Sequence, residues 1–102
     1  MTPEGKVKKE VRVYLDSLGA YYFMPMQTGY GAKTVDFLCC INGRFVGIEC
    51  KRPGIYKPDP FQANIIKKIH AAGGLAFVTD SGERAEKYIK DHVFGAYDYA
   101  RE

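Results

Sequence analysis

Several features that would assign this chain to a familiar class are missing from its sequence. The 102 residues include no tryptophan, only five prolines and three cysteines, and no run of about 18 apolar residues. The N-terminal stretch MTPEGKVKKE is too polar for a secretory signal. These absences exclude a membrane-spanning helix of ordinary length. We expect one compact domain over residues 1–102, located in the cytoplasm.

The cysteines are too few and too poorly spaced for a metal site. Cys39, Cys40 and Cys50 form neither a CxxC pair nor any other zinc-ligand spacing. We therefore expect three reduced thiols packed in the core.

Charge alone says little about a partner. The net charge is +3, which is only mildly basic and is weak evidence for nucleic acid. The basic residues nevertheless gather in three groups, each of which can equally be a solvated face: Lys6, Lys8, Lys9 and Arg12; Lys51, Arg52 and Lys57; and Lys67 and Lys68.

Apolar spacing and helix-capping signals predict seven elements in the order α-β-β-β-α-β-α. The helices are expected over residues 3–18, 60–72 and 82–91, with Thr2, Asp59 and Ser81 as their caps. The strands are expected over 20–24, 75–79 and the two arms of a hairpin within 35–52, and a glycine-bearing loop over 27–33. A right-handed crossover would place the last strand parallel to the second hairpin arm, which makes a mixed α/β sheet flanked by helices.

The hairpin VDFLCCINGRFVGIECKR combines an apolar face with three charges. One face carries Val35, Phe37, Cys39, Ile41, Val46, Ile48 and Cys50, which predicts a core surface. The middle helix is expected to turn Phe61, Ile65, Ile69 and Ala72 inward.

The charges of the hairpin converge if Asn42 and Gly43 form a type I′ turn. Counting outward from this turn places Asp36 opposite Glu49, with Lys51 on the same face. Two carboxylates about 5 Å apart repel each other unless a cation lies between them. Such oxygen ligands suit Mg²⁺ or Mn²⁺, although the two acids can also lie at a solvated sheet edge and pair with Lys51.

A third acid is expected from the first helix. Glu4 falls at the edge of the stripe formed by Val7, Val11 and Leu15, whereas Glu10 lies further from it. Glu4 can equally be a first-turn acid favoured by the helix dipole.

An acid on one strand followed by Glu-x-Lys on the next resembles the PD-(D/E)XK nuclease superfamily. The wider pattern, from GKVKKEVRVYLDSLGAYYFMP through the hairpin to Gln62 and AAGGLAFV, is similar to the VRR-NUC (virus-type replication-repair nuclease) family. The similarity runs from about Thr2 to Asp80. It departs from the motif at Val35, where the superfamily has proline, a residue that supplies no ligand. The resemblance implies the restriction-endonuclease-like core of that superfamily.

The resemblance also implies roles for individual residues. Asp36, Glu49 and the Cys50 carbonyl would bind Mg²⁺ or Mn²⁺, with Glu4 as the first-helix acid. Lys51 would sit beside the attacking water, and Gln62 would orient the site. Asp59 and Gln62 also have capping-box spacing, so Gln62 can simply close the start of its helix.

Stand-alone, phage-type members of this family resemble Holliday-junction resolvases, which implies a homodimeric endonuclease in a bacterial or phage-infected cell that cuts four-way DNA junctions. Lys33, Arg52, Lys57 and the Tyr30 loop would meet the DNA backbone, although Tyr30 can equally be a packing residue. A flap- or restriction-like nuclease and a non-catalytic DNA-binding or protein-interaction module remain alternatives.

Overall fold

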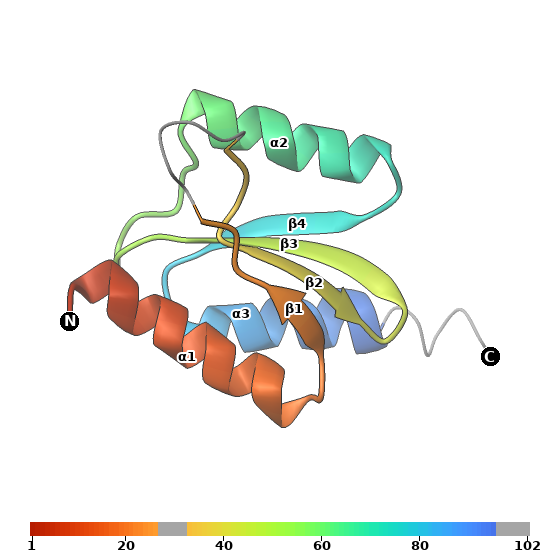
Figure 1. Cartoon of the computed structure of the whole chain (residues 1–102), viewed down its shortest axis with the longest axis horizontal. Helices are drawn as coiled ribbons and strands as arrows, with labels where there is room; N and C mark the ends of the chain where they lie inside the picture. Colours follow the sequence, from red (N-terminus) through yellow and green to blue (C-terminus); the bar gives the residue numbers. More distant parts are fainter. Residues whose placement is uncertain (27–32, 96–102) are drawn as a thin grey trace.

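The computed structural model describes residues 1–26 and 33–95, which form a four-stranded mixed sheet with helices on both faces (Figure 1). In these residues, no helix has the length and apolar character needed to cross a membrane. The elements confirm the predicted order and add a π-helical turn after the last helix. They are α1 (Pro3–Ser17), β1 (Tyr21–Phe23), β2 (Phe37–Ile41), β3 (Arg44–Cys50), α2 (Pro60–Ala71), β4 (Leu75–Thr79), α3 (Gly82–Ile89) and η1 (Lys90–Gly95).

The first helix begins and ends where the sequence predicts. The Thr2 hydroxyl accepts a hydrogen bond of 3.0 Å from the Gly5 amide, and Gly19 ends the run with a φ of 66°. Its inward stripe is fully buried and consists of Val7, Val11 and Leu15.

The sheet has the strand order β1-β2-β3-β4, with β3 and β4 parallel and the other pairs antiparallel. Asn42 and Gly43 both have positive φ, 50° and 79°, as a type I′ turn requires. The predicted hairpin register therefore holds, from Ile41 opposite Arg44 to Phe37 opposite Ile48.

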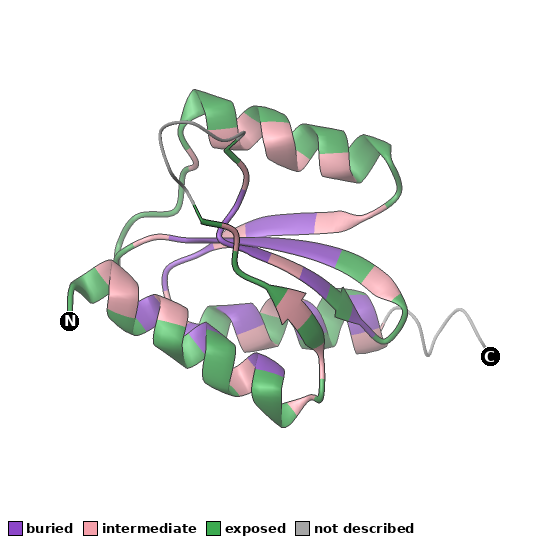
Figure 2. Ribbon diagram, in the orientation of Figure 1, coloured by how far each residue is buried: buried purple, intermediate pink, exposed green. Residues whose placement is uncertain are grey.

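The core lies between the sheet and the pair α1 and α3, which cover one face (Figure 2). All seven predicted core positions of the hairpin are buried. Full burial of one large aliphatic or aromatic side chain is worth about 1.5–3 kcal/mol. Cys40, however, is exposed, so the prediction of a buried thiol is wrong there: neighbouring residues alternate between faces, and Cys40 follows the buried Cys39.

The opposite face is covered only in part, by α2. No residue of this helix is buried (Figure 2), and Ile65 and Ile69 are half-buried. Phe61 and Ala72 are exposed, which contradicts the predicted inward stripe. Between these two positions α2 packs closely on β4 and β3, because a Cβ at Gly47 would lie 2.9 Å from Ile69 Cδ1.

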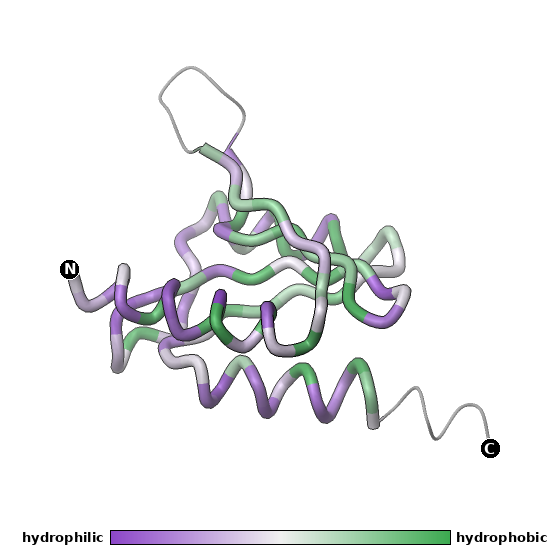
Figure 3. Tube along the Cα trace, turned by 60° about the horizontal axis from the view of Figure 1, so that its bottom comes forward, coloured by the Kyte–Doolittle hydropathy of each residue, from purple (hydrophilic) through white to green (hydrophobic). Residues whose placement is uncertain are grey.

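The last helix alternates hydrophilic and hydrophobic residues along its length (Figure 3). Its buried residues are Gly82, Ala85 and Ile89. Ser81 caps it by accepting a hydrogen bond of 3.1 Å from the Arg84 amide, and the Gly82 amide donates to Glu10 Oε1 at 2.9 Å. Glu10 of α1 therefore helps to hold the start of α3.

Replacing Gly82 by alanine should destabilise the contact between α1 and α3. The added Cβ would lie 2.6 Å from Glu10 Cβ, so the two helices must separate. We expect Gly82→Ala to lower the free energy of unfolding by about 1–3 kcal/mol in urea titrations. Glu83→Ala, at the exposed neighbouring position, should cost less than about 1 kcal/mol. Equal losses in the two variants would contradict the close contact.

Candidate functional site

A cleft of about 660 Å³ opens where β3 ends, between the first turn of α1 and the first turn of α2. Its wall includes Thr34, Pro60, Phe61 and Gln62. The charged residues that line it are Glu4, Lys8, Lys33, Asp36, Glu49, Lys51 and Asp59. The structure thus brings the predicted acids, lysine and glutamine to one place.

Asp36 lies one residue before β2 rather than within it. The strand pairing stops at Phe37, so the prediction that Asp36 is directly paired with Glu49 is wrong in detail. Instead, Asp36 Oδ2 accepts a hydrogen bond of 2.8 Å from the Cys50 backbone amide. The carboxylate takes the donor that a continuing strand would have used, which fixes it beside Glu49.

Glu49 is the most buried acid of the cleft, with a side chain that is 4% exposed. Lys51 Nζ lies 3.5 Å from Glu49 Oε2, and Gln62 Nε2 donates a hydrogen bond to the same oxygen. The other oxygen, Oε1, is buried without a hydrogen-bond partner among the described residues. Burial, and next the nearby Asp36 carboxylate, raise the pKa of Glu49 to about 7, although Lys51 opposes this shift.

Gln62 forms the predicted capping box and also contacts Glu49, while its role in orienting a catalytic site stays a prediction. Its Oε1 accepts a hydrogen bond of 3.2 Å from the Asp59 amide, while Asp59 Oδ1 accepts one of 2.8 Å from the Gln62 amide. This is a complete capping box at the start of α2. Because the side-chain nitrogen points to Glu49, the same residue joins the helix start to the acid.

The two acids of α1 have separate surroundings. Glu4 lines the cleft, whereas Glu10 binds the Gly82 amide at the start of α3. Lys8, one turn after Glu4, reaches both Glu4 Oε2 at 3.9 Å and Asp36 Oδ1 at 3.4 Å.

Lys8 was not among the residues predicted for the site. The signal was present in the sequence, because residues four apart share a helix face and Glu4 was already a candidate. Its membership of a group of four basic residues instead favoured a solvated role.

The predicted DNA-contacting residues are spread more widely than the acids. Lys33 lines the cleft, but Arg52 and Lys57 are exposed in the connection between β3 and α2 and do not line it. Tyr30 lies outside the described residues.

Two contacts that sequence reasoning missed anchor this connection. The Gly54 amide donates a hydrogen bond of 2.8 Å to Asp80 Oδ2, and the Arg84 guanidinium lies 4.3 Å from the centre of the Tyr56 ring. The segment that carries Arg52 and Lys57 is thereby held to the end of β4 and to the first turn of α3.

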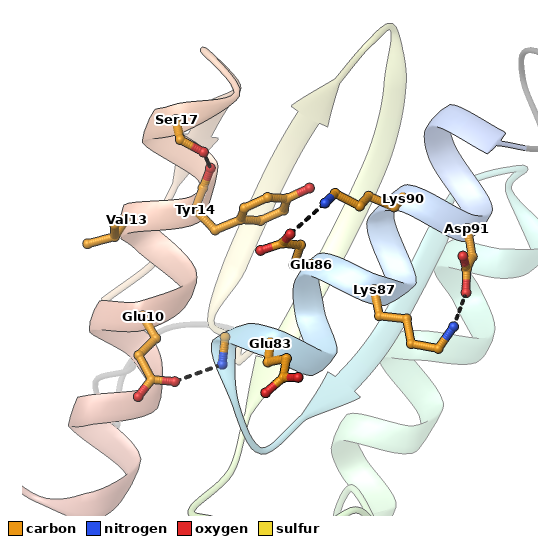
Figure 4. Close-up of a pocket in the computed structure, with 10 residues that line it drawn as sticks. Glu10, Val13, Tyr14, Ser17, Glu83, Glu86, Lys87, Lys90 and Asp91 are labelled. Atoms are coloured by element: carbon orange, nitrogen blue, oxygen red, sulfur yellow. Dashed lines mark hydrogen bonds and ion pairs between the residues drawn. The ribbon is translucent and has the colours of Figure 1, made fainter.

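A second hollow of about 740 Å³ lies between α1 and α3 (Figure 4). Its charged side chains largely satisfy one another: Lys87 binds Asp91 at 2.9 Å and Lys90 binds Glu86 at 2.6 Å. It contains none of the predicted site residues, and its ion pairs and the Glu10 contact are structural in character.

The cleft acids suit a divalent cation with few protein ligands. Among the described residues, no three His, Cys, Asp or Glu side chains are close enough together to hold a metal. Asp36 and Glu49 nevertheless supply hard oxygen ligands, and within residues 1–26 and 33–95 the buried Glu49 Oε1 has no partner, a place that a cation could take. Mg²⁺ commonly retains several waters and needs only one or two carboxylates. Asp36 and Glu49 therefore fit such an ion, while Glu4 and the Cys50 carbonyl remain predicted ligands.

In the metal-free protein, ionisation of the buried Glu49 should lower the free energy of unfolding by a measurable amount. Its raised pKa means that the neutral acid stabilises the fold below about pH 4.5, and that this contribution is lost as the pH rises through about 7. We compare the free energy of unfolding of Glu49→Gln with that of the parent in urea, in the presence of chelator. The difference should shift in favour of the variant by about 2–3 kcal/mol as the pH is raised from 4 to 8. The exposed Glu83→Gln should show no comparable change. A pH-independent difference for Glu49→Gln would contradict the raised pKa.

Comparison with known proteins identifies the fold. No protein-family model matches the chain, and no curated protein matches it. A solved structure described as a VRR_NUC domain is similar to it, with a TM-score of 0.75 and 24% identity over 91% of this chain and 99% of that one. The chain therefore has the fold of a VRR-NUC domain, as the sequence resemblance implied.

Proposed function

We propose that this chain is a metal-dependent endonuclease of the VRR-NUC family, which hydrolyses phosphodiester bonds in branched DNA. The observation that carries the proposal is the pair of adjoining acids, Asp36 and Glu49, with a buried carboxylate oxygen that has no partner among the described residues. The fold shared with a VRR_NUC domain supports it.

The charge of the cleft also favours a metal. Four acids and three lysines line it, so its formal charge is −1, whereas the whole chain carries +3. A DNA phosphate would be repelled by the acids unless a cation came with it. Mg²⁺ or Mn²⁺ would be held by Asp36 and Glu49, with Glu4 and the Cys50 carbonyl as further candidates.

The chain's own residues are arranged to orient such a reaction. The Cys50 amide fixes Asp36, and Gln62 fixes Glu49, so neither carboxylate has to reorganise when substrate binds. Lys51, beside Glu49, would stabilise negative charge that develops on the phosphate and would lie next to the attacking water. A bound metal would polarise the phosphate and lower the pKa of a water ligand.

The DNA backbone would be positioned by basic groups around the cleft. Lys33 lies in its wall, and Arg52 and Lys57 extend the positive charge along the anchored connection. Such contacts fix the position of a duplex without reading its bases. Tyr30 remains a candidate for the same role.

Four-way junctions are the substrate that we favour, cut by a homodimer. A two-fold dimer would match the approximate two-fold symmetry of a junction and would place one cleft on each of two strands. A flap- or restriction-like nuclease is the alternative within the same chemistry. A non-catalytic module is disfavoured because it would have no reason to keep the destabilising Asp36 and Glu49 side by side.

Cleavage should require both the metal and the cleft residues. On a four-way junction with Mg²⁺ or Mn²⁺, Asp36→Asn, Glu49→Gln and Lys51→Ala should each lower the rate at least about 100-fold, because each removes a group that acts on the reacting phosphate. Lys51→Arg should not restore it, since arginine is bulkier and always protonated. Product formation on labelled strands measures the rate.

The matched control is Lys67→Ala, an exposed lysine of α2 that does not line the cleft. It should retain activity. Flap, nicked and plain duplex substrates of equal length test selectivity. Equal cutting of plain duplex and junction would contradict junction preference, and no cleavage of any substrate would contradict the nuclease.

The dimer has its own measurement. Light scattering at micromolar concentration should give twice the chain mass of 11.5 kDa. We expect this state because paired cuts need two clefts. A protein mass of one chain, both free and in the complex with junction DNA, would contradict the dimer. It would not contradict the proposed hydrolysis.

A further inference from the structure

We propose that Lys8 is an internal counter-ion of the cleft, which neutralises its acids in the absence of metal and competes with the metal for Asp36. This inference rests on the proposed function, because it assigns a positioning residue to the same metal site.

The position of the ammonium group carries the inference. Lys8 Nζ lies 3.4 Å from Asp36 Oδ1 and 3.9 Å from Glu4 Oε2, so it joins α1 to the start of β2. Asp36 Oδ2 is already occupied by the Cys50 amide. Oδ1, the oxygen that faces Lys8, therefore has more capacity left for a metal than Oδ2, which already accepts one hydrogen bond.

Two of the three lysines that line the cleft lie beside its two most buried acids. Lys51 lies beside Glu49 and Lys8 beside Asp36, so each of the two proposed metal-binding carboxylates has an ammonium group of its own. A divalent ion bound between these acids would bring two positive charges to the place where two ammonium groups already lie. Mutual repulsion would then favour movement of the less confined lysine.

Lys8 is the less confined of the two. Its side chain is 34% exposed, against 18% for Lys51, although the distances to the neighbouring carboxylates are similar, 3.4 Å from Lys8 to Asp36 and 3.5 Å from Lys51 to Glu49. A partly hydrated ammonium on a flexible stem costs little to displace. Once displaced, it would remain in the cleft wall, where a DNA phosphate would be its natural partner.

This arrangement has a consequence for affinity. A cation that must displace Lys8 binds more weakly than it would to the acids alone, and a phosphate that captures Lys8 removes the competition. Metal and DNA would therefore strengthen each other's binding, because coupling between two sites is reciprocal.

The test is a titration of the protein with Mn²⁺ in the absence of DNA, in which electron paramagnetic resonance measures the concentration of free Mn²⁺. Lys8→Met should bind Mn²⁺ about fivefold more tightly than the parent, the size expected from loss of a partly exposed ion pair. Lys9→Met, an exposed neighbour on the same helix, should leave the affinity unchanged. Asp36→Asn should abolish the tight site in either background.

Thermal melting gives a second readout that does not depend on affinity alone. In chelator, Lys8→Met should melt below the parent because Asp36 and Glu4 lose their cation, and saturating Mn²⁺ should remove this difference. Lys8→Gln serves as a second variant if the methionine folds poorly.

The outcomes separate the two proposals. If the parent binds Mn²⁺ through Asp36 but both Lys8 variants bind it equally or more weakly, the counter-ion is overturned and the nuclease stands. If Lys8→Met melts lower by the same amount with and without Mn²⁺, Lys8 is merely structural. If the parent binds no Mn²⁺, both proposals fail.

Discussion

The cleft depends on one hydrogen bond, from the Cys50 amide to the Asp36 carboxylate. Antiparallel pairing of β2 and β3 ends at Phe37 and Ile48, and a carboxylate replaces the next backbone acceptor. This substitution places an acidic side chain where the backbone hydrogen bonds of a sheet would otherwise continue. The opening between the strands and the helices begins at that point, and Glu49 and Lys51 face it from the end of β3.

Two helices complete the site with their first turns. Thr2 caps α1 just before Glu4, and the capping box of Asp59 and Gln62 starts α2. The N-terminal end of a helix carries partial positive charge, which favours anions nearby. Both helix starts lie at the cleft, so their partial charge would also favour the phosphate of the proposed substrate. In α2 the link is direct, since the residue that closes the capping box also holds Glu49.

The sequence predicted those parts of the molecule that local rules determine. Asn42-Gly43 set the hairpin register, alternation set its buried face, and capping residues located the helices within a few positions. The prediction failed where the burial or the neighbours of a residue depend on tertiary packing. Phe61 follows a helical apolar pattern, yet α2 covers only part of its sheet face and leaves this ring exposed. Lys8 looked like one member of a basic group, and only the approach of α1 to β2 placed it beside Asp36.

The surroundings of Glu49 lower the stability of the fold. A buried carboxylate with one unpartnered oxygen and a second acid nearby is less stable than a neutral pair in the same position. A domain of this size has a small core, so such a cost is a sizeable part of its total stability. Lys51 and Gln62 reduce it but leave Oε1 without a partner among the described residues. The proposed metal site would explain this arrangement, because a cation would give the unpartnered oxygen a ligand, whereas a purely structural ion pair would have been closed on both sides.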